Sequence, residues 1–87
     1  MTKENILKRL DSYFKNSQIE VHDITGGSNH FSIFILSEQF ESMPLIKRHK
    51  MIYKIFEKEL TKEIHALQIK PLTYKEWNQK TSNKKTP

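Results

Sequence analysis

The most regular pattern of apolar and polar positions lies in residues 45–60. At 100° per residue, one side of a helix there carries apolar residues and a histidine, namely Leu45, Ile46, His49, Ile52, Tyr53, Phe56 and Leu60. The opposite side carries lysines, namely Lys47, Lys50, Lys54 and Lys58. The pattern predicts an amphipathic helix with a basic outer stripe, with Pro44 in its first turn and Ser42 as its N-cap.

Strands are predicted where the pattern alternates between apolar and polar positions. This occurs in three stretches, at residues 18–24, 30–36 and 64–70. The first two flank a glycine-containing stretch at residues 25–29, which favours a hairpin turn because glycine tolerates positive φ. The third stretch follows the basic helix and places His65 near its start, at the edge of the more apolar face.

Helices are also predicted at both ends of the chain. Residues 3–16 carry apolar side chains at helical spacing, with Thr2 as a candidate N-cap. Thr73 and Glu76 form a capping-box pattern that opens a last helix carrying Trp77, which we expect to be structural. The order helix, strand, strand, helix, strand, helix predicts an α+β fold, with a three-stranded mixed sheet and helices mainly on one face.

Length and charge indicate one small, mildly basic domain. We expect a single domain over residues 1–79 and a disordered, lysine-rich tail over residues 80–87. The formal net charge is +5, but three of the lysines belong to the tail. The chain has no cysteine, so a metal would have to be held by histidine, by carboxylates or by the ligands of a partner.

Several functional classes are disfavoured by what the sequence lacks. No apolar run reaches the length of a membrane span and no signal-peptide core is visible, so we expect a cytoplasmic protein with no membrane partner. Nucleophile-elbow, P-loop, dinucleotide-binding and H-E-x-x-H motifs are absent, and the carboxylates are scattered. We therefore do not expect an enzyme.

The four histidines differ in their expected surroundings. His49 falls near the centre of an apolar helix face, which is typical of a buried structural histidine hydrogen-bonded to backbone. His22 lies on the polar side of the first predicted strand, and His30 opens the second beside the glycine turn. Judged by spacing alone, His65 at a strand start is also more typical of a structural residue than of a ligand.

Linked motifs change the interpretation of His65. The run F-E-S-M-P-L-I-K-R-H-K-M-I-Y at residues 40–53, the run I-H-A-L-Q-I-K at residues 64–70 and the following Trp77 resemble the BolA family, as does N-H-F at residues 29–31. The resemblance implies a fold related to KH nucleic-acid domains. It also implies that the histidine of the I-H-A-L motif, His65, ligates a [2Fe-2S] cluster shared with a monothiol glutaredoxin and glutathione, for cluster trafficking or for iron and redox regulation. No cofactor is then expected in the isolated protein, which would be a monomer or weak homodimer.

The resemblance does not decide which residue is the second ligand of the cluster. The family usually supplies a Cys or His from the loop between the first two strands, but residues 24–29 contain neither. His30 and His22 stand at the two ends of this loop, and His30 is preferred because it lies next to the glycines. Two further departures are Ser42, where the family often has glycine, and Tyr74, where it often has proline.

Nucleic-acid binding is the alternative function. Some BolA-like proteins resemble transcriptional regulators, and a cluster of basic residues at one end of the central helix could contact DNA phosphates, namely Lys47, Arg48, Lys50 and Lys54. Against this, the chain lacks the G-x-x-G loop with which KH domains hold a nucleic-acid backbone. The same basic face could instead meet an acidic patch on the glutaredoxin.

Overall fold

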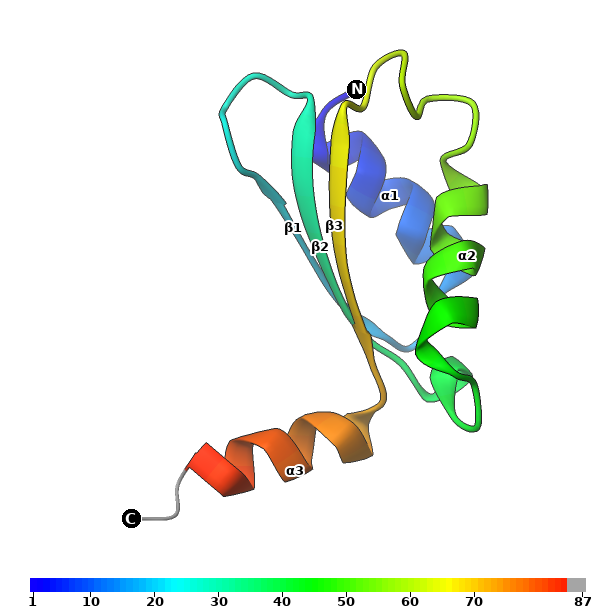
Figure 1. Ribbon diagram of the computed structural model, residues 1–87, viewed down its shortest axis with the longest axis vertical. Coiled ribbons are helices and arrows are strands. Elements are labelled where there is room, and N and C mark those ends of the chain that lie inside the picture. Colours follow the sequence, from blue (N-terminus) through cyan, green and yellow to red (C-terminus); the bar gives the residue numbers. More distant parts are fainter. Residues whose placement is uncertain (85–87) are drawn as a thin grey trace.

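The computed structural model describes the backbone of residues 1–84 and the side chains of residues 1–80 (Figure 1). Its elements in chain order are α1 (Lys3–Tyr13), β1 (Gln18–Asp23), β2 (His30–Leu36), the short 3-10 helix η1 (Glu38–Phe40), α2 (Leu45–Ile55), β3 (Ala66–Leu72) and α3 (Tyr74–Lys84). Helices α1 and α2 lie on one face of the sheet, and α3 extends from the end of β3 (Figure 1). None of the helices in the described part is long and apolar enough to cross a membrane.

The sheet has the order β1-β2-β3, with β1 antiparallel and β3 parallel to β2. The antiparallel pair is a hairpin, whereas the parallel pair needs the crossover through η1 and α2. Val21, Ile33 and Ile69 stand in register across the three strands. The predicted α+β fold with a three-stranded mixed sheet is confirmed.

The hydrophobic core lies between the sheet and the two covering helices. Alternate residues of β2 point into it, because successive side chains of a strand face opposite sides of a sheet. Its buried members are Ile6, Leu10, Phe14, Phe31, Ile33, Ile35, Phe40, Ile52, Phe56, Ile64 and Leu67. Aromatic rings from different elements meet there, as in the Phe14–Phe40 pair, whose centroids are 5.3 Å apart.

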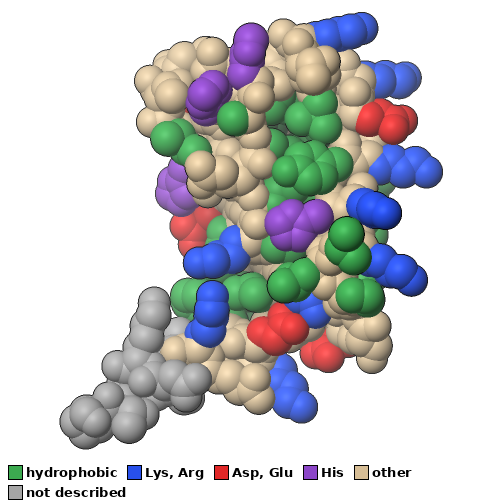
Figure 2. Space-filling view, viewed as in Figure 1, with side chains coloured by type: hydrophobic (Ala, Val, Ile, Leu, Met, Phe, Trp, Pro, Cys, Tyr) green, Lys and Arg blue, Asp and Glu red, His purple; other side chains and the backbone are tan. Residues whose placement is uncertain are grey.

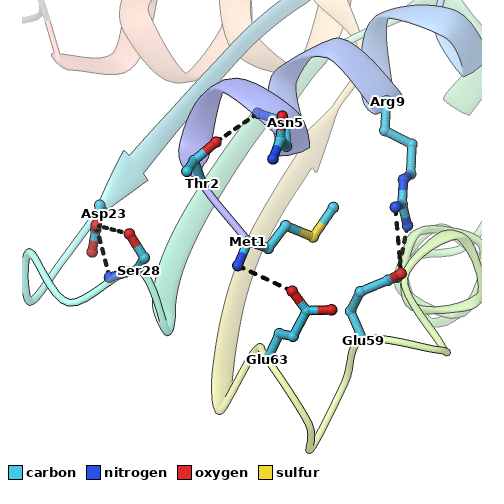
Figure 3. Close-up of polar contacts among 8 residues, drawn as sticks. All are labelled: Met1, Thr2, Asn5, Arg9, Asp23, Ser28, Glu59 and Glu63. Atoms are coloured by element: carbon cyan, nitrogen blue, oxygen red, sulfur yellow. Dashed lines mark hydrogen bonds and ion pairs between the residues drawn. The ribbon is translucent and has the colours of Figure 1, made fainter.

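The predicted caps of the first and last helices are confirmed. The backbone N–H of Asn5 donates to the Thr2 hydroxyl at 3.2 Å (Figure 3). At the start of α3, the Thr73 N–H donates to a Glu76 carboxylate oxygen at 2.9 Å, and the Glu76 N–H donates to the Thr73 hydroxyl at 3.1 Å. Both helices therefore begin where local polar side chains replace missing backbone partners.

The central helix is shorter than predicted, and the side that it buries differs from the predicted apolar side. Helix α2 ends at Ile55, so Phe56 and Leu60, which were predicted on its apolar side, lie beyond its end. Its N-cap is Pro44, whereas Ser42 lies outside the helix at φ +61°. Its buried residues are Arg48 and Ile52, and the predicted apolar residues at its start are exposed.

The boundaries of other predicted elements also shift: α1 ends at Tyr13 and not at residue 16, and β1 ends at Asp23 and not at residue 24. The third strand begins at Ala66, because Ile64 is buried in the preceding loop and forms an isolated bridge with Leu60. Helix α3 continues to Lys84, past the expected end of the domain at residue 79, and no proline interrupts residues 74–84. Residues 85–87 of the predicted tail lie outside the described residues.

Candidate functional site

Two histidine rings lie side by side at one end of the sheet. His30 is the first residue of β2, and His65 directly precedes β3. Their ring centroids are 6.4 Å apart, with 32° between the ring planes. His65 is exposed and His30 is half-buried. Figure 2 shows histidine side chains grouped at this end of the molecule.

The parallel pairing of β2 and β3 brings the two histidines together. His30 stands opposite Ala66 in the strand register. The carbonyl of Asn29 accepts hydrogen bonds from the backbone N–H groups of His65 at 2.8 Å and Ala66 at 3.2 Å. The backbone on either side of the histidine pair is therefore joined directly.

The β1–β2 hairpin loop closes beside His30 through Asp23. The Asp23 carboxylate accepts a hydrogen bond at 3.0 Å from the N–H of Gly26. It accepts another, also at 3.0 Å, from the N–H of Ser28 (Figure 3). Gly26 has φ +77°, which glycine adopts at little steric cost, and the Ile24 N–H donates to the His30 carbonyl. Sequence reasoning missed Asp23, although an Asp that precedes a glycine turn often bonds to the backbone N–H groups that follow it.

The loop before His65 is held by ion pairs to α1 and to Met1, which precedes that helix. Arg9 donates to the Glu59 carboxylate at 2.6 Å, and the Met1 amino group lies 3.2 Å from the Glu63 carboxylate (Figure 3). The Arg9 hydrogen bond lowers the pKa of Glu59, against a smaller opposing effect of burial. These contacts restrain the chain that leads into His65.

His22 occupies a different place. It lies on β1 opposite Ser32, its side chain is 66% exposed, and its Nε2 is 3.4 Å from a Glu20 carboxylate oxygen. The structure thus brings His30, and not His22, into ring contact with His65. No group of three or more His, Cys, Asp or Glu side chains within the described part of the chain is arranged to hold a metal.

Arg48 does not belong to a basic surface, so its predicted placement there is wrong. Only 4% of the residue is exposed, and its guanidinium donates to the Met43 and Pro71 carbonyls at 2.8 and 3.0 Å. Two further hydrogen bonds, at 2.7 and 3.0 Å, join it to both oxygens of Glu76. These bonds and the Thr73 N–H lower the pKa of Glu76 to about 2. Arg48 therefore joins α2 to β3 and α3, whereas Lys47, Lys50 and Lys54 are exposed.

The two residues expected to be structural are each about half-buried. His49 is less buried than predicted, and its ring lies 6.4 Å from that of Tyr53 instead of bonding to backbone. His49 is less buried than predicted because α2 buries the side that carries Arg48 and Ile52. Trp77 packs edge-on against Phe34, with centroids 5.2 Å apart. Phe34 lies between the core residues Ile33 and Ile35 on β2, so its side chain faces away from the core.

The described residues form a small α+β domain with a pair of histidines at one end of its sheet. The chain belongs to the BolA family, since the family model described as BolA-like protein matches residues 9–76. Protein BOLA2 of Arabidopsis thaliana is 45% identical over 71 residues, covering 80% of this chain and 75% of the relative. The DNA-binding transcriptional regulator BolA of Escherichia coli is 33% identical over 84 residues, covering 88% and 80%. Neither relative carries an enzyme name.

The fold agrees with a solved member of the family. The crystal structure of a bol-like protein from Babesia bovis matches with a TM-score of 0.80 and 32% identity, and the match covers 93% of this chain and 94% of that one. The predicted resemblance to the BolA family is therefore confirmed.

Proposed function

We propose that this protein is a non-catalytic partner of a monothiol glutaredoxin and that its His65 co-ligates a [2Fe-2S] cluster bridging the two proteins. The observation that supports this proposal is the ring contact between His65 and His30 at an accessible end of the sheet. His30 is accordingly the second candidate ligand.

The donor set fits a shared cluster. A neutral imidazole nitrogen can take the place of a thiolate on iron, and this replacement raises the reduction potential of the cluster. The chain contributes no cysteine, and two imidazoles fall short of the four ligands of such a cluster. The remaining ligands would be the glutaredoxin cysteine and the thiol of glutathione. When bound, the cluster supplies a redox-active unit that can be transferred or sensed.

The test is a titration of this protein into cluster-loaded monothiol glutaredoxin with glutathione, followed by visible absorption and circular dichroism. We expect the charge-transfer bands to change and to saturate at a defined ratio, because an imidazole replaces one ligand of the glutaredoxin-bound cluster. In His65→Ala these changes should be lost, and in His30→Ala they should be altered. His22→Ala is the matched control, since that histidine lies apart from the pair.

Far-ultraviolet circular dichroism should show that all three variants keep their fold. If His65→Ala produced the same visible spectrum as the parent protein, His65 would not be a ligand.

A second candidate function is transcriptional regulation through DNA. It is favoured by the exposed lysines of α2 and by the name of the E. coli relative. A K47E/K50E variant should then bind duplex DNA more weakly, and the slope of log affinity against log salt should fall by about 2 if each lysine contacts one phosphate. Affinity and slope equal to those of the parent protein would exclude this use of the helix.

A further inference from the structure

Helix α2 exposes a strip of large side chains, of which Leu45 and Ile46 are the most exposed. We call this set of four residues the docking strip: Leu45, Ile46, His49 and Tyr53. Leu45 is 56% exposed, Ile46 65% and Tyr53 38%. Their spacing places them on one side of the helix, so their apolar surfaces are adjacent. Single exposed apolar residues are ordinary, but a contiguous set indicates an interaction surface.

The helix that carries the docking strip is attached to β3 at two points. Near its end, the Tyr53 hydroxyl donates to the Leu67 carbonyl at 3.2 Å. In its first half, Arg48 donates to the Pro71 carbonyl at 3.0 Å. The helix is thus held in place before a partner binds, which reduces the ordering cost of association.

The charge around the docking strip indicates an acidic partner. Lys47, Lys50 and Lys54 are exposed on the same helix, and residues 42–56 contain no Asp or Glu. Figure 2 shows a row of basic side chains beside apolar ones over α2. A second copy of this chain would bring like charges together. A nucleic acid would place phosphates over Leu45 and Ile46, which cannot pair with them.

The docking strip and the histidine pair lie close enough together for one interface to cover both. Tyr53 contacts β3 at Leu67, only two residues beyond His65, or about 7 Å along a strand. From Tyr53 the docking strip continues to Leu45, a rise of about 12 Å along the helix. A standard interface buries about 800 Å² on each partner, which is enough to cover both. Figure 2 shows histidine side chains at the sheet end and over α2 on the same face.

We infer that the docking strip is the surface to which the cluster-sharing monothiol glutaredoxin binds. The glutaredoxin would contact it with an apolar patch that is surrounded by acidic residues. This inference rests on the function proposed above, because it assigns a binding surface to the same partner. The docking strip would supply affinity and orientation, while His65 supplies the ligand.

The experiment measures the Kd for cluster-free monothiol glutaredoxin by isothermal titration calorimetry and then records the visible spectrum of the saturated, cluster-loaded complex. The test variant is L45S/I46S, and Leu7→Ser is the matched control because Leu7 is an exposed apolar residue on α1. We expect the Kd to rise at least tenfold for L45S/I46S and to stay within twofold for the control. At saturation the spectrum of L45S/I46S should equal that of the parent complex.

The two proposals fail in different ways. If L45S/I46S bound the glutaredoxin as tightly as the parent protein, the docking inference would be overturned while the spectrum still reported on His65. Loss of affinity for duplex DNA but not for glutaredoxin would also overturn it. Conversely, His65→Ala with parent-like affinity and an altered spectrum supports both proposals, whereas an unchanged spectrum removes the ligand role alone.

Discussion

Replacing Arg48 by alanine is expected to lower the free energy of unfolding by about 3 kcal/mol, because the change removes the buried member of an ion pair together with its hydrogen bonds to two backbone carbonyls. The guanidinium bonds to the carbonyls of Met43 and Pro71 as well as to Glu76. Its loss leaves those carbonyls without their donor. The measurement is urea denaturation followed by far-ultraviolet circular dichroism.

Lys47→Ala is the matched control for this prediction. Lys47 is the neighbouring basic residue of α2 but is exposed, so its loss should change the free energy of unfolding by about 0.5 kcal/mol or less. Equal effects of the two substitutions would contradict the structural role of Arg48.

The pH dependence of stability provides an independent check on the same ion pair. The pKa of Glu76 is about 2 in the folded protein, below its ordinary value of 4.5, chiefly because of the Arg48 hydrogen bonds. A lowered pKa in the folded state means that the stabilisation is complete above about pH 4.5 and is lost as the pH falls towards 2. The parent protein should therefore lose more stability across this range than Glu76→Gln does. If the free energy of unfolding fell equally with pH in the parent protein and in Glu76→Gln, the Glu76 carboxylate would not contribute to stability in this range.

Phe40→Ala is expected to cost about 3–5 kcal/mol of stability, the range typical of removing a buried aromatic ring. Phe40 is fully buried in the connection between β2 and α2. Its ring contacts that of Phe14, and the Arg48 guanidinium lies 5.6 Å from its centroid. The cavity would therefore open where α1 meets the segment that leads into α2.

The measurement for Phe40→Ala is again chemical denaturation, with Tyr13→Ala as the control. Tyr13 is an aromatic residue of α1 but is 56% exposed, so its truncation should cost far less. A loss below about 1 kcal/mol for Phe40→Ala would mean that the surrounding side chains collapse into the space.

Most of the fold could be predicted because its signals are local. The second strand begins at His30 and ends at Leu36, as its alternation predicts, and the Thr2 cap and the Thr73–Glu76 box form as expected. Caps and turns depend on residues only a few positions apart. The end of α2 was harder to place, because Phe56 and Leu60 continue the apolar spacing after the helix has ended.

The candidate site could be predicted only in part. Motif resemblance singled out His65, and the position of His30 beside the glycines favoured it over His22. Ring contact between His30 and His65, however, depends on the parallel register of β2 and β3, which pairs segments more than thirty residues apart. Alternation within one strand cannot report which residue of another strand lies opposite.

By itself, therefore, the sequence determined the order of the elements, their amphipathic faces and the family to which the chain belongs. Only the tertiary structure decided that Arg48 is buried and that Leu45 and Ile46 are exposed. Helical periodicity assigns a charged side chain to solvent unless its partners are known. Glu76 and the Pro71 carbonyl, the partners of Arg48, come from distant parts of the chain and reach α2 only when the chain has folded.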